Sequence, residues 1–191
     1  MLTHYFELRA IPQLEITEVE VVNKLMQALH LELINHQGKI AIGFPRYTMQ
    51  QRKYLGGIIR LFGEEDQLQQ LKKALSQSHA ITDYAIILDI SLIPEKIKGY
   101  LMLSRVHQKG QSALRRAEKR LTQQGKWSPE VRSRMEQKWR EQQRHYPHVH
   151  LYSRSTGQKF VLWISQRQFA QPQTGEFNCY GLSQNATVPD F

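Results

Sequence analysis

The first 94 residues alternate between strand-like and helix-like segments, and this order constrains the fold more than any other feature of the chain. Segments rich in β-branched and aromatic residues predict strands at 2–11, 39–44, 58–62 and 84–93. Apolar residues three and four positions apart predict helices at 17–36 and 64–76. The resulting β-α-β-β-α-β order is that of the ferredoxin-like split βαβ motif. We therefore expect an α+β fold, which by itself says little about function.

Positive charge is concentrated in the second half of the chain. Residues 1–94 hold nine Lys and Arg against ten Asp and Glu, a net charge of −1. Of the totals of 26 and 17, the remaining 17 and 7 lie in residues 95–191, where the net charge is +10. Such an asymmetry predicts a near-neutral scaffold joined to a part that binds a polyanion. We therefore expect a ferredoxin-like domain at 1–94 and a smaller basic α/β domain at 95–191, with an arginine-rich helix and C-terminal strands.

The most basic stretch is predicted to form a helix over residues 113–124. At about 100° per residue, one side of this helix is apolar and carries Leu114, Ala117 and Leu121. The opposite side holds four cations, Arg115, Arg116, Lys119 and Arg120. A cationic face of this kind can follow a nucleic acid, because neutralised phosphates release condensed counterions. A solvated surface helix is the alternative interpretation of the same pattern.

The rest of the second half is predicted to contain one more helix and short strands. A short link without an element of its own follows Pro94 and leads to the basic helix. Ser128 and Pro129 are typical of a helix start, and this helix reaches about residue 145. Strands are predicted at 148–152, 159–164 and 177–182, and the first two can form a hairpin.

Cysteine content and hydropathy exclude two classes of protein. The single cysteine, Cys179, cannot build a disulfide framework and fits a reducing compartment. No apolar run approaches the roughly 18 residues of a membrane span, so we expect a cytoplasmic protein without a membrane partner. His145, His148 and His150 cluster, but they lack a Cys or carboxylate at ligand spacing. We therefore expect neither a metal site nor a cofactor.

Candidate chemical groups lie in one helix and two turns. His30 falls at the rim of the apolar stripe of the helix at 17–36. An imidazole titrates near neutrality and can act as a general base, although most histidines at such a rim do nothing catalytic. Hydroxyls, glycines and aromatics occupy the turn-like segments 153–160 and 179–183. Their aromatics, Phe160 and Tyr180, either stack on a base or belong to the core.

Five motifs follow one another over nearly the whole chain. They are His4-Tyr5; Leu29-His30 followed by Phe44-Pro45; Ser104-Arg105-Val106 at the start of the basic helix; Ser153 to Phe160; and Cys179 to Ser183 ahead of Val188 to Phe191. Together they resemble the CRISPR-associated endoribonuclease of type I-F systems, which cuts precursor CRISPR RNA at a repeat hairpin. The resemblance implies a ferredoxin-like first domain and a smaller second domain, whose arginine-rich helix enters the major groove of the hairpin.

The resemblance implies a role for each matching residue. The catalytic histidine falls on His30, the active-site serine on Ser153, and the tyrosine that orients the histidine on Tyr180. Near the cut, the implied RNA contacts are Ser155 and Thr156, and Phe160 lies beneath the closing base pair. Arg105 and His107 contact the base of the stem. The implied contacts in its major groove are Arg115, Arg116, Lys119 and Arg120. One member of the family has a glutamine at the position of His107, which points to a different repeat stem here.

The resemblance also implies a metal-independent reaction. The ribose 2′-OH upstream of the scissile phosphate attacks the phosphorus, the 5′-oxygen leaves, and a 2′,3′-cyclic phosphate remains. His30 takes the 2′-OH proton, Ser153 holds the sugar in line, and turn amides around Thr156 and Gly157 stabilise the phosphoryl oxygens.

The partners implied by the resemblance are precursor CRISPR RNA and the mature CRISPR RNA, to which the enzyme stays bound. Other subunits of the type I-F crRNA-guided surveillance complex are implied as protein partners. Two alternative functions remain open. In the first, the protein is a non-cleaving subunit that binds the RNA hairpin, and in the second it is a basic DNA-binding regulator.

Overall fold

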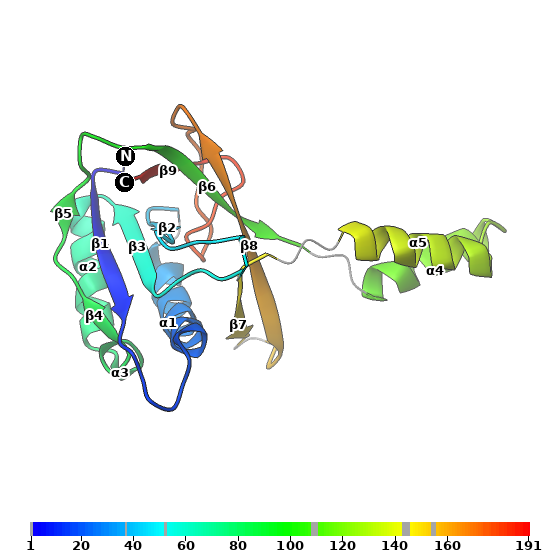
Figure 1. The fold of residues 1–191 in the computed structure, drawn as a ribbon, viewed down its shortest axis with the longest axis horizontal. Helices are drawn as coiled ribbons and strands as arrows, with labels where there is room; N and C mark the ends of the chain where they lie inside the picture. The colour runs from blue at the N-terminus through cyan, green and yellow to red at the C-terminus, as the bar shows by residue number, and fades with distance from the viewer. Residues whose placement is uncertain (1, 37, 52, 108–110, 143–145, 154–155) are drawn as a thin grey trace. The chain divides into compact units, whose positions relative to one another are not determined.

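The first part of the chain forms an antiparallel sheet (Figure 1). The computed structural model describes residues 2–36, 38–51, 53–107, 111–142, 146–153 and 156–191. The strands of the first sheet are β1 (His4–Ala10), β2 (Ala41–Gly43), β3 (Ile58–Gly63), β4 (Ala85–Ile87) and β5 (Ser91–Leu92). Their order is β2-β3-β1-β4, and β5 also pairs with β1. β3 lies between β1 and β2 and pairs antiparallel with both, so β1 and β2 run parallel to each other.

Along the chain, the helices of this part alternate with its strands. They are α1 (Glu18–Leu33), extended by a 3₁₀ turn (Ile34–His36), then α2 (Glu65–Ser76) and the short α3 (His79–Thr82). The order of elements is the predicted one, except that α3 is added and that the single strand predicted at 84–93 is two strands, β4 and β5. The α+β class is confirmed. A capping box starts α1: Thr17 Oγ1 accepts the Glu20 N–H at 3.3 Å, and Glu20 Oε2 accepts the Thr17 N–H at 2.8 Å.

A second antiparallel sheet has the order β7-β8-β6-β9. Its strands are β6 (Gly99–Val106), β7 (His148–Tyr152), β8 (Lys159–Phe169) and β9 (Val188–Asp190). The predicted hairpin is confirmed, because β7 pairs with β8 from His148 opposite Trp163 to Tyr152 opposite Lys159.

Two sequence predictions are wrong in this region. The predicted link after Pro94 contains the eight-residue strand β6, so Ser104-Arg105-Val106 ends a strand and does not open the basic helix. Residues 177–182 form a turn and not a strand, because Gly181 adopts a φ of +69°. The last strand instead lies at the C-terminal end, in β9.

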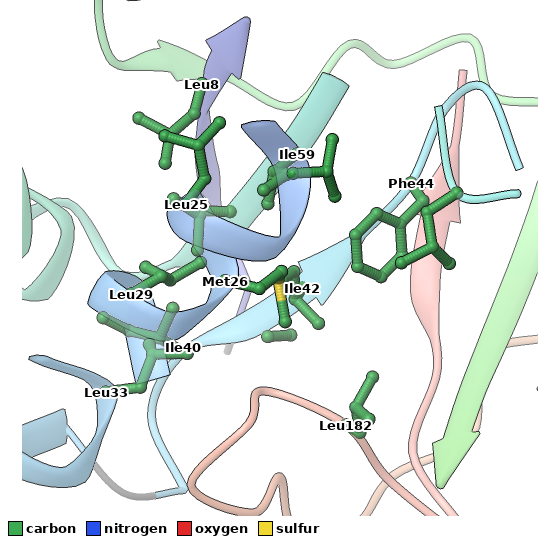
Figure 2. Packing of buried hydrophobic residues seen from close by; sticks show 14 of the residues in the cluster. Leu8, Leu25, Met26, Leu29, Leu33, Ile40, Ile42, Phe44, Ile59 and Leu182 are labelled. Carbon is green, nitrogen blue, oxygen red and sulfur yellow. The ribbon is translucent and has the colours of Figure 1, made fainter. Parts of the chain in front are cut away.

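A single apolar core joins the two sheets. Figure 2 shows Met26 of α1 beside Ile42 of β2, and Leu182 from the C-terminal segment belongs to the same buried cluster. Buried residues of the second sheet, including Leu162 and Ile164, belong to the same cluster. Burial of this shared surface holds the C-terminal segment against β2 and α1.

The chain divides into two compact units. One comprises residues 1–106 and 146–191, and the other residues 107–145. This division differs from the predicted boundary at residue 94, because β6 pairs with β8 from Tyr100 to Val106 and both sheets share a core. Residues 107–145 hold eleven Lys and Arg against four Glu, a net charge of +7 out of +9.

The described residues of the unit 107–145 form two helices, α4 (Gln111–Gln123) and α5 (Pro129–Gln142). Its apolar seam includes Leu114, which is buried. The four cations of the predicted face, Arg115, Arg116, Lys119 and Arg120, are all exposed. Across the described part of the chain, no helix combines the length and the apolar character needed to cross a membrane.

A buried acid and two arginines lie on β1 and β3. Glu7 is 4 % exposed and accepts hydrogen bonds from Arg60 (2.8 and 2.9 Å) and Arg9 (2.8 and 3.0 Å). Arg60 also donates to the main-chain oxygen of Phe191 at 3.0 Å and lies 4.0 Å from the centre of its ring. Burial raises the pKa of Glu7, but the hydrogen bonds and charges of both guanidinium groups outweigh it and hold that pKa below its usual range.

Candidate functional site

His30, near the end of α1, is held by two groups from the C-terminal segment. Its Nδ1 atom lies 3.0 Å from the main-chain oxygen of Cys179. Because a carbonyl oxygen only accepts, Nδ1 carries the hydrogen, and Nε2 keeps its lone pair in the neutral ring. The ring of Tyr180 stacks on the imidazole, with ring centres 4.2 Å apart and an angle of 12° between the planes. The site therefore presents an imidazole of defined tautomer and orientation.

The turn that holds His30 is built by two residues that we did not predict as functional. Asn178 Oδ1 accepts the N–H groups of Tyr180 (2.8 Å) and Leu182 (3.3 Å). Gly181 accepts the Ile42 N–H at 2.9 Å, and a Cβ on it would meet Ile42 at 3.1 Å. An Asn followed by a Gly three residues later is a turn signal in the sequence, but the contact with β2 has no local signal.

An aromatic and a cationic residue extend the group around Tyr180. Phe160, the second residue of β8, lies edge-on to Tyr180 with ring centres 6.4 Å apart. The guanidinium of Arg105, from β6, lies 5.7 Å from the centre of the Tyr180 ring and 5.8 Å from that of Phe160. Burial raises the pKa of Tyr180 above its usual range, and the charge of Arg105 opposes this rise. Tyr180 is therefore a neutral phenol at physiological pH.

Ser153 lies in the turn between β7 and β8. Its N–H donates to the Gln158 carbonyl, and its own carbonyl accepts the Gly157 N–H, both at 2.9 Å. Ser153 Oγ accepts the Thr156 N–H at 3.3 Å. The two amides expected to stabilise phosphoryl oxygens, those of Thr156 and Gly157, thus donate within the turn, which corrects that expectation. Thr156 is exposed, and Ser155 lies outside the described residues.

The predicted histidine cluster does not form a metal centre in the part that the structure describes. His148 packs 4.2 Å from Trp163 and 5.1 Å from His150, measured between ring centres. Among the described residues, no three His, Cys, Asp or Glu side chains are placed to hold a metal ion. His145 lies outside the described residues.

Comparison with known proteins gives one family model that matches residues 5–191, described as "CRISPR-associated protein (Cas_Csy4)". The chain belongs to the Cas_Csy4 family. A relative from Escherichia coli (strain UTI89 / UPEC) is 33% identical over 192 residues, covering 98% of this chain and 99% of that protein. A relative from Pseudomonas aeruginosa (strain UCBPP-PA14) is 29% identical over 190 residues, with the same coverage. Both relatives are described as "CRISPR-associated endonuclease Cas6/Csy4".

A solved structure described as "An RAMP protein binding different RNA substrates" matches 98% of this Cas_Csy4 family member and 100% of that chain. Its TM-score is 0.37 and its sequence identity 11%, so the similarity is too low to support a conclusion about fold or function.

In this Cas_Csy4 family member, four predicted site residues form one contiguous group. They come from four segments distant in sequence and are His30, Arg105, Phe160 and Tyr180. Ser153 lies in the hairpin turn whose strand β8 carries Phe160. His107 and the four cations of α4 belong to the other compact unit, where all five are exposed.

Proposed function

We propose that this protein is a metal-independent endoribonuclease that cleaves precursor CRISPR RNA at the base of its repeat hairpin. The observation that carries this proposal is the arrangement around His30. Its Nδ1 is occupied by the Cys179 carbonyl and its ring is stacked on Tyr180, so Nε2 is the atom available to take a proton. Membership of the Cas_Csy4 family, with relatives described as CRISPR-associated endonucleases, supports a nuclease activity. The sequence resemblance described above makes precursor CRISPR RNA the proposed substrate.

The proposed reaction begins at the ribose 2′-OH upstream of the scissile phosphate. His30 Nε2 takes the 2′-OH proton as the oxygen attacks phosphorus, and the bond to the 5′-oxygen breaks. The leaving 5′-oxygen takes a proton from water, His30 Nε2 returns its proton to water, and the upstream product ends in a 2′,3′-cyclic phosphate. Ser153 holds the attacking sugar in line, a contribution of orientation. Tyr180 keeps the imidazole plane in place through the stack described above.

The proposed binding of the hairpin uses both compact units. Phe160 stacks beneath the closing base pair, and Arg105, whose guanidinium lies over both aromatic rings, contacts the base of the stem. His107 contacts the neighbouring base, and Thr156 and Ser155 contact RNA near the cut. The cations of α4 bind phosphates in the groove of the stem, which supplies affinity without chemistry. The enzyme then remains on the mature CRISPR RNA and joins other subunits of the type I-F complex.

Three substrates test this proposal. They are the repeat RNA, the same RNA with a 2′-deoxyribose at the cut site, and a duplex DNA of the same sequence. We expect cleavage of the first alone, with a 2′,3′-cyclic phosphate end, and tight binding of the second without cleavage. Tight binding of the repeat RNA without any cleavage of it would instead identify a non-cleaving hairpin-binding subunit. Preference for the duplex DNA would identify a DNA-binding regulator.

A further inference from the structure

We propose that Gln27, helped by Asn23, is a positioning residue that sets the spacing between His30 and Ser153 by binding the free edge of β7. This inference rests on the function proposed above. Neither amide side chain is assigned a contact with RNA. Both act on the main chain of the strand that leads into Ser153.

The contacts are hydrogen bonds from main-chain N–H groups at one edge of β7 to side-chain oxygens of α1. β7 stands at the end of the sheet order β7-β8-β6-β9, so among the described strands it pairs with β8 alone. On its other edge, Gln27 Oε1 accepts the Tyr152 N–H at 2.6 Å, and Asn23 Oδ1 accepts the His150 N–H at 3.0 Å. Side chains of α1 therefore accept main-chain N–H groups that a neighbouring strand would otherwise bind.

The two contacts run in step along helix and strand. They are four residues apart on α1, a rise of about 6 Å, and two residues apart on β7, a rise of about 6.6 Å. The next residue on this face of α1, three positions after Gln27, is His30, because residues three and four apart share a helix face. The next residue after Tyr152 is Ser153. Gln27 thus ties helix to strand three residues before His30 and one residue before Ser153, the two proposed catalytic groups.

His30 is held independently of this tie. The Cys179 carbonyl and the Tyr180 ring fix its imidazole from the C-terminal segment. Loss of the Gln27 bond would therefore leave the imidazole in place and let the Ser153 turn move relative to it. A displacement of about 1 Å can lower a reaction rate by about 100-fold, whereas binding through distant contacts is retained.

Paired substitutions separate this role from a general loss of packing. Gln27→Met keeps the length of the side chain and removes its acceptor, whereas Gln27→Glu keeps acceptor oxygens. Gln69→Met is the matched control, since this exposed α2 side chain donates to Glu65 of the same helix and lies on a different element from Gln27. Two quantities are measured: the single-turnover cleavage rate at saturating protein, and the Kd for repeat RNA with a 2′-deoxyribose at the cut site.

We expect Gln27→Met to lower the single-turnover rate by about 10- to 100-fold with Kd changed less than about twofold. Gln27→Glu should recover at least about half of that loss on a logarithmic scale, and Gln69→Met should match the wild type. Asn23→Leu, compared with Asn23→Asp, should show a smaller effect of the same direction, since its contact lies one turn farther from His30. This second pair also decides the matter if Gln27→Met fails to fold.

The proposal is overturned if Gln27→Met cleaves at the wild-type rate, if Gln27→Glu is as slow as Gln27→Met, or if Kd rises in proportion to the loss of rate. A wild-type protein that leaves repeat RNA intact would remove the proposed function itself. If the wild-type protein cleaves repeat RNA and Gln27→Met cleaves it at the same rate, only the positioning role is removed.

Discussion

The cations of α4 offer the most direct test of how the hairpin is held. We consider the replacement of Arg115, Arg116, Lys119 and Arg120 by alanine. All four side chains are exposed, and the buried Leu114 on the opposite side is left unchanged. Alanine has the highest helix propensity of any residue, so the helix should persist.

The magnitude follows from counterion release. The slope of log K against log salt is negative, and removing one cation–phosphate interaction reduces its magnitude by about 0.9 for a duplex. Removing four interactions therefore reduces the magnitude by about 3.6. Between about 50 and 200 mM salt, the wild-type affinity should then fall roughly 150-fold more than that of the variant. The single-turnover rate at saturating protein should change little, because the proposed chemistry uses residues of the other unit.

The assay is the Kd for uncleavable repeat RNA as a function of KCl concentration. The control replaces Lys24, Lys39, Lys53 and Lys73, which are exposed cations outside α4, and so removes the same net charge. We expect the control to keep most of the wild-type slope. If the α4 variant keeps the wild-type slope, or if the control reduces the slope as much as the α4 variant does, the groove-binding role of α4 is wrong.

Three further predictions concern the catalytic group, metal independence and pH. His30→Ala should abolish cleavage and leave Kd for uncleavable RNA within about threefold, as measured by gel shift; weaker binding with residual cleavage would contradict the proposed base. Cleavage should be unchanged in EDTA, and a rate restored only by added divalent ions would contradict a metal-independent reaction. Because its folded pKa is lowered, Glu7 stabilises the fold above its unfolded pKa, and this stability is lost as pH falls through the folded pKa. Glu7→Gln should cost about 1.5–3 kcal/mol at pH 7 and flatten the acid side of a urea-midpoint profile, and an unchanged profile would show that the ion pairs contribute nothing net.

The local elements could be predicted because their signals lie within a few residues of one another. The capping box of α1 and the alternation in β7 each depend on neighbours along the chain. The strand β6 is missed because its middle, Leu101 to Leu103, consists of Leu and Met, which favour helices in isolation. Its pairing with β8 leaves no local signal that would correct this preference. Without β6, the sequence predicts a domain boundary at residue 94, ahead of a strand that belongs to the first unit.

The sequence by itself determined β1 to β3 of the first sheet, the cationic face of α4 and, through resemblance, the residues proposed to act. Only the tertiary structure decided how those residues meet. His30 and the Cys179 carbonyl that orients it are 149 positions apart, and the Gln27 bond to β7 spans 125. No periodicity records such a contact, because it depends on the burial of a core shared by both sheets and not on neighbouring side chains.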